Sequence, residues 1–285
     1  MTESFLPSYR RPKDTAFRQQ RLAAWRPLVK RSCAIISFFS LFLVLFCVGL
    51  LLLLSSNTSS TKTVEYSSIA GCNIGDSCTT TFTISEIMKE PVFFYYKLEN
   101  VFQNHRRYVQ SRDDDQLMGV TGRTYSDVDF CLPMRTINDK DSEPVLNPCG
   151  LTANSVFNDT FSLLDPSSSP VTLSTDNISW KADDTKFKTS SEQSVDVTDP
   201  RFKNWMRVAA LPNFMKLYGR IDRDLAPGTY TINLDNNWPV DAFDGKKSVV
   251  LTTTTWIGVS PITLGVFYLV TSIIVGAMGL SFVFM

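Results

Sequence analysis

Residues Ser32–Ser56 read SCAIISFFSLFLVLFCVGLLLLLSS and contain no charged side chain. A membrane-spanning helix needs about 20 predominantly apolar residues, because each residue adds about 1.5 Å of length. A secretory signal peptide has a shorter apolar region, of about 7 to 15 residues, which follows a short basic stretch. The run here is longer and a full basic tail precedes it, which favours a retained transmembrane helix over residues 33–55.

The far end of the chain repeats this pattern, because no charged residue occurs from Ser248 to Met285. The segment Val249–Trp256 is rich in β-branched residues and predicts a strand that ends at an interfacial tryptophan, Trp256. The remaining residues 259–285 predict a second transmembrane helix, with its membrane part at Pro261–Phe284. The sequence therefore predicts an integral membrane protein with two spans.

The charged residues predict how the chain is oriented. The 285 residues include 28 basic and 28 acidic side chains, a balance that gives no reason to expect nucleic acid as a partner. Residues 1–32, however, carry eight basic groups and two acidic ones. Basic segments stay on the cytosolic side of a membrane. We therefore expect residues 1–32 and the C-terminus in the cytosol, and one lumenal or extracellular domain at residues 56–258.

The cysteines fit an oxidising compartment. Two of the six lie in the first span, and the other four are Cys72, Cys78, Cys131 and Cys149. An even number in such a compartment favours disulfides, and four cysteines allow three pairings. Proximity in sequence favours Cys72–Cys78 and Cys131–Cys149. A zinc site is the alternative, but the spacing C-x5-C with one distant histidine suits zinc poorly.

Glycan acceptor triplets, N-x-S/T, occur at Asn57, Asn158 and Asn177. Asn57 lies almost at the membrane surface, where the glycosylating enzyme would not reach it. We therefore expect glycans at Asn158 and Asn177.

The outer domain reads as mostly antiparallel β-sheet, in a β-rich α+β fold. Short β-branched or aromatic runs separated by turn residues predict its strands. Besides Val249–Trp256, these runs are Thr79–Ile84, Val92–Leu98, Val171–Thr175 and Thr229–Leu234. The helical pattern is strongest over Pro200–Ile221, which Asp199 can cap and Pro212 should break or kink. Asp165–Asp199 is polar and predicts a long surface excursion.

The stretch Phe102–Leu117, FQNHRRYVQSRDDDQL, contains the only histidine, His105. A Ser-His-Asp triad would have to use it, but the neighbouring Arg106 and Arg107 would disfavour the imidazolium that a triad forms. A structural histidine, packed or hydrogen-bonded, is the simpler interpretation. The aspartates Asp113–Asp115 could bind calcium, hydrolyse a glycoside or lie exposed. We favour ion pairs between these aspartates and the arginines at 106, 107 and 112.

Four blocks of the chain resemble the cell-cycle-control-protein-fifty (LEM-three-like) family, the accessory β-subunits of the type-four P-type ATPases that flip phospholipids. The blocks are Phe93–Gly119, Pro148–Phe161, Phe202–Asp222 and Leu225–Gly258. Two spans at matching places complete a likeness that covers most of the chain.

The resemblance implies a non-catalytic glycoprotein without catalytic, metal or cofactor residues. Its partners would be the ATPase and membrane lipids, and the ATPase would need it to leave the endoplasmic reticulum and to translocate phospholipid. The pair would reside in the endoplasmic reticulum, Golgi, endosomal or plasma membrane. The resemblance also implies the disulfide pairing given above and a glycan at Asn158. Many members have two more cysteines near Cys72 and Cys78, which this chain lacks.

Partner contacts can be predicted for two parts of the chain. The ion-paired block would shape the surface that meets the ATPase, with His105, Arg106, Arg107, Arg112, Asp113 and Asp114 as candidates. In the second span, Gly276 and Gly279 would permit close approach of an ATPase helix. The alternatives are a membrane-anchored ectoenzyme that uses the aspartates and a cell-surface receptor.

Overall fold

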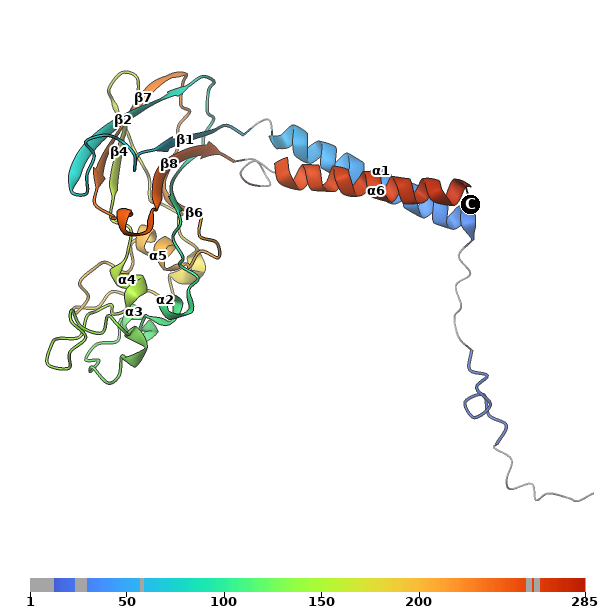
Figure 1. The fold of residues 1–285 in the computed structure, drawn as a ribbon, viewed down its shortest axis with the longest axis horizontal. Helices are drawn as coiled ribbons and strands as arrows, with labels where there is room; N and C mark the ends of the chain where they lie inside the picture. Colours follow the sequence, from blue (N-terminus) through green and yellow to red (C-terminus); the bar gives the residue numbers. More distant parts are fainter. Residues whose placement is uncertain (1–12, 24–29, 57–58, 255–257, 259–261, 285) are drawn as a thin grey trace, which may run out of the picture. The chain divides into compact units, whose positions relative to one another are not determined.

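The computed structural model describes residues 13–23, 30–56, 59–254, 258 and 262–284. Its chain divides into two compact units, of which one holds the two long helices and the other is Leu53–Ile262 (Figure 1). Each unit is described by itself. The predicted interfacial Trp256 and the acceptor Asn57 lie outside the described residues.

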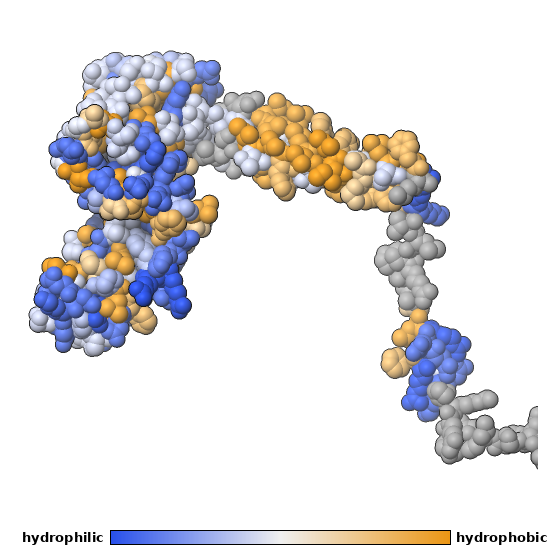
Figure 2. All heavy atoms as spheres, viewed as in Figure 1, coloured by the Kyte–Doolittle hydropathy of each residue, from blue (hydrophilic) through white to orange (hydrophobic). Residues whose placement is uncertain are grey.

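Two helices, α1 (Arg31–Ser56) and α6 (Ile262–Phe284), are long and apolar enough to cross a membrane. They have 26 and 23 residues, which at about 1.5 Å per residue exceeds a hydrocarbon core of about 30 Å. Figure 2 shows that hydrophobic side chains cover nearly all of their visible surface. Such a surface suits lipid and the helices of other membrane proteins.

The two helices pack against each other through the small residues of α6. Gly265, Ser272, Gly276 and Gly279 are its buried residues. A Cβ added at Gly276 would lie 3.0 Å from the Phe42 ring, and one at Gly279 would lie 3.1 Å from Phe38 Cβ. The face that we expected to receive an ATPase helix is therefore occupied by α1 of the same chain.

The other unit contains two four-stranded antiparallel sheets. The first has the order β1 (Thr61–Glu65), β8 (Lys246–Thr253), β3 (Val92–Glu99), β6 (Phe214–Ile221). The second has the order β2 (Asp76–Ile84), β7 (Gly228–Asn236), β4 (Thr160–Leu164), β5 (Pro170–Val171). The β-rich antiparallel fold class predicted from the sequence is confirmed.

The sheets form a sandwich because alternate side chains of each strand point inward. Burial alternates along the whole of β3, as expected for a strand with one face in the core. Phe161 of β4 lies between the sheets, with its ring centroid 5.5 Å from that of Phe94 and 5.0 Å from that of Tyr218. Phe94 and Tyr218 belong to β3 and β6, so one aromatic cluster joins the two sheets.

Two long insertions form what we call the helical lobe, residues 100–159 and 172–213. Its short helices gather at one end of the sandwich (Figure 1). In chain order they are α2 (Arg106–Gln110), α3 (Asp114–Leu117), η2 (Asp129–Cys131), α4 (Leu151–Asn154), η3 (Lys181–Asp183) and α5 (Pro200–Met206). A last short helix, η4 (Asp241–Phe243), lies between β7 and β8.

The prediction of one helix over Pro200–Ile221 is half wrong. The Asp199 carboxylate accepts a hydrogen bond from the Arg201 N–H at 2.9 Å and caps α5, but this helix ends at Met206. Residues Phe214–Ile221 form β6 instead, because pairing with β3 outweighs their helical spacing. The predicted strand Val171–Thr175 is also shorter, since only Val171 belongs to a strand and Ser174 makes a single bridge to Arg220.

Candidate functional site

The aspartate triplet begins the short helix α3. The Asp113 carboxylate caps it by accepting a hydrogen bond from the Asp115 N–H at 3.1 Å. Each of the three carboxylates has an arginine partner. Arg112 Nε lies 2.9 Å from Asp114 Oδ1, and Arg123 reaches both Asp113 at 3.0 Å and Asp115 at 3.3 Å. The acids are therefore held by cations of the same lobe.

The expected pairing with Arg106 and Arg107 is wrong. Neither of these exposed arginines has a carboxylate within 4.0 Å among the described residues. Arg123 takes their place because the chain turns back after α3 and brings it beside Asp113 and Asp115. No pattern in the sequence points to Arg123, because a loop separates it from the triplet.

His105 is exposed and precedes the first turn of α2. Its backbone carbonyl accepts hydrogen bonds from the Tyr108 and Val109 N–H groups at 2.9 and 3.0 Å. Within the described part of the chain, no hydroxyl or carboxylate is hydrogen-bonded to its imidazole ring. The prediction of a packed or hydrogen-bonded side chain is therefore wrong, and the geometry of a Ser-His-Asp triad does not form around it.

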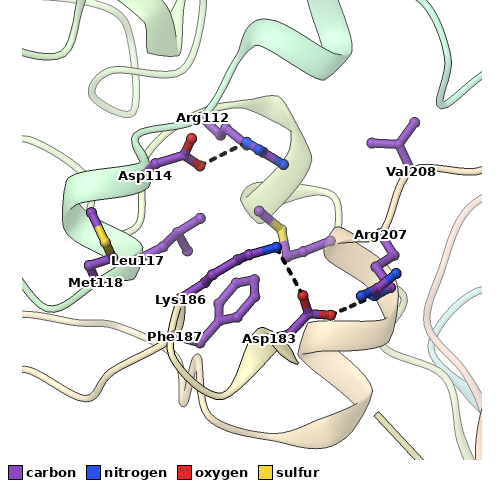
Figure 3. A pocket seen from close by; sticks show the side chains of 10 residues that line it. Arg112, Asp114, Leu117, Met118, Asp183, Lys186, Phe187, Arg207 and Val208 are labelled. Carbon is purple, nitrogen blue, oxygen red and sulfur yellow. Dashed lines mark hydrogen bonds and ion pairs between the residues drawn. The ribbon is translucent and has the colours of Figure 1, made fainter. Parts of the chain in front are cut away.

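A hollow of about 560 Å³ lies between α3, η3 and the end of α5 (Figure 3). The Arg112–Asp114 pair borders one side, and on the other Asp183 contacts both Lys186 at 3.3 Å and Arg207 at 2.5 Å. Burial opposes ionisation of Asp183, but hydrogen bonds from Arg207 and Lys186 outweigh it and lower the pKa of the carboxyl group. Three basic and two acidic side chains thus line this hollow, and each of them contacts a group of opposite charge.

A second and larger hollow, the apolar groove, has a volume of about 1030 Å³. Phe102, Phe130 and Leu132 line it with side chains that are 57%, 75% and 49% exposed. Arg107 and His105 also border it. The apolar groove therefore brings the basic part of the block beside a large apolar surface.

The disulfides Cys72–Cys78 and Cys131–Cys149 are both present. The second lies in the helical lobe and is tied to the block by two buried side chains. Ser111 Oγ donates to the Cys131 carbonyl at 3.1 Å, and Gln116 Oε1 accepts from the Cys149 N–H at 2.8 Å. The block Phe102–Leu117 and the disulfide loop consequently form one structure.

A buried ion pair joins the two sheets. Lys247 Nζ on β8 lies 2.8 Å from Asp159 Oδ2, just before β4, and the two side chains are 1% and 0% exposed. Tyr66 OH donates to the same oxygen at 2.7 Å, while the N–H groups of Asn237 and Trp238 donate to Oδ1, each at 2.6 Å. Burial lowers the pKa of Lys247, and the bond to Asp159 opposes this shift. Sequence reasoning missed this pair, although Asp159 is the middle residue of the Asn158 glycan acceptor.

A second buried lysine, Lys216 on β6, has no carboxylate partner among the described residues. Its ammonium group donates to the carbonyls of Asn204 at 3.0 Å and Trp205 at 3.4 Å, and also to that of Arg207. These carbonyls lie at the C-terminal end of α5, where a cation is favoured. Burial nevertheless lowers the pKa of Lys216 to about 8, and the charge of Arg207 adds to the shift.

The two predicted glycan acceptors that the structure describes, Asn158 and Asn177, have exposed side chains. Asn177 lies at a turn with a positive φ of 56°, a conformation that asparagine tolerates better than most residues. Both side chains can be reached from solvent in the folded unit, which a glycan on either would require.

The family of the chain follows from its comparison with known proteins. A model of the LEM3 (ligand-effect modulator 3) family / CDC50 family matches residues 54–285, which include the sandwich, the helical lobe and α6. The chain belongs to the LEM3/CDC50 family. It is 35% identical to "Cell cycle control protein 50A" of Mus musculus, over 91% of this chain and 85% of the relative.

Other LEM3/CDC50 relatives are similar to the same degree. "Putative ALA-interacting subunit 2" of Arabidopsis thaliana is 35% identical over 94% of this chain and 85% of the relative. "Cell cycle control protein 50B" of Homo sapiens is 34% identical over 91% of this chain and 89% of the relative. The family resemblance predicted from the sequence is confirmed.

Proposed function

We propose that this chain is the non-catalytic accessory β-subunit of a type-four P-type ATPase that translocates phospholipid. The observation that carries the proposal is family membership over almost the whole chain, with relatives named as ALA-interacting subunits. A subunit of this kind contributes surfaces rather than reacting groups. The paired charges of the aspartate block fit such a role, because they fix the shape of the helical lobe.

The proposed topology places residues 1–32 and the C-terminus in the cytosol, spans at 33–55 and 259–285, and residues 56–258 in the lumen or outside the cell. Two apolar terminal helices and an N-terminal segment with eight basic and two acidic groups support it. The two disulfides in Leu53–Ile262 favour an oxidising compartment for that unit. Asn158 and Asn177 would carry glycans there.

In this proposal the chain acts first as a chaperone. It binds the newly made ATPase, allows it to fold and to leave the endoplasmic reticulum, and remains bound while the ATPase moves lipid in the Golgi, endosomal or plasma membrane. The ATPase supplies ATP hydrolysis and the pathway for the lipid. This chain contributes no catalytic residue, cofactor site or metal site.

The experiment is removal of this chain from cells that contain the ATPase. The proposal predicts that the ATPase keeps glycans of the endoplasmic-reticulum type and that uptake of fluorescent phospholipid falls to background, while re-expression restores both. Normal export and uptake without the chain would contradict it. If the chain were an ectoenzyme, its removal would instead abolish hydrolysis of an offered substrate. If it were a receptor, its purification would recover a soluble ligand or a ligand on another cell.

A further inference from the structure

The buried pair of Lys247 and Asp159 has a third member, the side-chain amide of Asn236. The Lys247 ammonium group donates to Asn236 Oδ1 as well as to Asp159 Oδ2, and all three residues are buried. The carbonyl carbon of Asn236 is one bond, about 1.2 Å, from that oxygen. An amine and a carboxamide are therefore in contact between the two sheets, since Asn236 ends β7 and Lys247 belongs to β8.

The side-chain amide of Asn236 is held in one orientation. Its Nδ2 donates to the backbone carbonyl of Cys72 at 2.9 Å. The Cys72–Cys78 disulfide fixes that carbonyl beside β7, because Cys78 belongs to β2 and pairs with Leu234 of β7. The oxygen of the amide, and not its nitrogen, consequently faces the Lys247 amine.

Asp159 is placed to take a proton from Lys247. Its Oδ2 lies 2.8 Å from Lys247 Nζ and accepts a hydrogen bond from Tyr66 OH at 2.7 Å. Transfer of one proton within the pair leaves a neutral amine and a neutral acid, and burial favours neutral groups over charged ones. Burial also lowers the pKa of Lys247. Once it has lost a proton, a lysine amine can act as a nucleophile.

We propose that Lys247 and Asn236 form an isopeptide bond, an amide between the two side chains that joins β8 covalently to β7. The Nζ lone pair attacks Asn236 Cγ, the Cγ–Nδ2 bond breaks, and Nδ2 leaves as ammonia. Asp159 takes two protons from Nζ and returns one to the departing nitrogen, and the other leaves with the ammonia as ammonium. An ammonium side chain and a carboxamide thus become an amide and an ammonium ion, without any oxidant or cofactor.

The other buried lysine, Lys216, lacks this arrangement. Its ammonium group donates to the backbone carbonyls of Asn204, Trp205 and Arg207. No side-chain amide or carboxylate is among its partners in the described part of the chain. A backbone carbonyl has no ammonia to release, so Lys216 stays a free lysine and serves as an internal control.

The bond adds a covalent link to the aromatic cluster that joins the two sheets. Asn236 lies in one sheet and Lys247 in the other, so the link crosses the sandwich. The ion pair of Lys247 and Asp159 is the unlinked state of the same chain, and free energies of unfolding that depend on this pair belong to that state. The inference does not depend on the proposed function.

The test is mass spectrometry of the full wild-type chain after purification, reduction and unfolding. Trypsin and a protease that cleaves before aspartate together cut the loop between Asn236 and Lys247 at Asp241, Asp244 and Lys246. The pieces with Asn236 and Lys247 carry no N-x-S/T triplet, so glycans do not alter their masses.

The proposal predicts that residues 235–240 stay joined to the piece that contains Lys247 in most of the chains. The joined mass should be about 17 Da below the sum of the two pieces, because ammonia has left, while cleavage after Lys216 is normal. Separate pieces in the wild-type chain overturn the proposal. A loss of the same mass from residues 235–240 alone would show a succinimide at Asn236, which also overturns it.

Two variants and a control test the roles of the residues. Asp159→Asn removes the proton acceptor and should lower the linked fraction at least about tenfold, as expected for loss of a general base. Lys247→Arg keeps the positive charge and should give no link. Asn233→Ala, on the same strand, removes an amide that accepts from Thr79 Oγ1 at 3.0 Å and should leave the link intact.

Linking at the wild-type level in Asp159→Asn, or loss of the link in Asn233→Ala, contradicts the assigned roles and overturns the proposal. The measurement on the wild-type chain needs no substitution, so it decides the question even where a variant fails to fold.

Discussion

The buried pair of Lys247 and Asp159 allows a quantitative prediction for Asp159→Asn. This substitution keeps the size of the side chain and also the glycan acceptor, since the triplet from Asn158 to Thr160 would still read N-x-T. It removes the only carboxylate within 4.0 Å of the Lys247 ammonium group among the described residues, and that lysine is 1% exposed. The new amide could accept from the Asn237 and Trp238 N–H groups, but its NH₂ would then face two donors, Lys247 Nζ and Tyr66 OH.

Removal of one partner from a buried ion pair costs about 3–5 kcal/mol, because it leaves an uncompensated charge in the interior. The whole free energy of unfolding of a domain is about 5–15 kcal/mol, so this loss would be a large fraction of it. We expect Asp159→Asn to fall in that range. Lys247→Met combined with Asp159→Asn should be less destabilised than the sum of the two single variants, because it leaves no buried charge unpaired.

The assay is urea unfolding of the full chain in mild detergent, followed by the fluorescence of its five tryptophans, of which Trp205 is buried in the core. The matched control is Asp235→Asn, an exposed aspartate that accepts from Ser77 Oγ at 2.6 Å and should cost less than about 1 kcal/mol. A loss below about 1 kcal/mol for Asp159→Asn, or strict additivity in the double variant, would refute the conclusion that this pair stabilises the sandwich.

Three further predictions concern other parts of the chain. Gly276→Leu should separate α1 from α6 and lower the melting temperature, because Phe42 occupies the space that a Cβ needs. Adding Phe42→Ala should raise the melting temperature again, and strictly additive effects of the two substitutions would contradict this packing. Loss of the Cys131–Cys149 bridge, with a sequence separation of 18, should cost about 3 kcal/mol of stability, against about 2 kcal/mol for the shorter Cys72–Cys78 bridge. Urea unfolding midpoints of the serine variants measure both losses, and an equal or reversed order contradicts the prediction. Since the folded-state pKa of Lys216 is about 8 and the unfolded value about 10.4, the unfolded chain binds more protons between these values, so stability rises with pH there. Wild type should gain about 1.5 kcal/mol between pH 8 and 9.5 relative to Lys216→Met, and parallel pH profiles would exclude this shift.

The sequence predicted those parts of the fold that depend on local composition. The two apolar helices follow from uninterrupted runs of apolar residues, and β2, β3, β7 and β8 follow from β-branched and aromatic runs. The strands β1 and β4 have five residues each, and β5 has two. Such short segments gain their stability from cross-strand partners far away in sequence, which local pattern does not reveal.

The candidate site was likewise predicted only where residues close in sequence decide the contact. The acids of the block were correctly expected to pair with arginines, yet only Arg112 of the three predicted partners does so. Arg123 supplies the other contacts because a loop closes back on α3, and this leaves Arg106 and Arg107 free of acidic partners among the described residues. Tertiary contact decides which charges are satisfied internally and which remain available to a partner.

The glycines of α6 show a prediction that the structure meets within the chain itself. Their spacing predicts close approach of a helix, and close approach is present, but the neighbour is α1 of the same chain. The other faces of α1 and α6 carry large apolar side chains that are exposed.

The central claim, that this chain is the accessory subunit of a type-four P-type ATPase, is tested most directly by purification in mild detergent from its native membrane, followed by mass spectrometry of the proteins that accompany it. The account predicts a type-four P-type ATPase in an amount comparable to that of the chain itself. Recovery of the intact, folded chain without any P-type ATPase would contradict it.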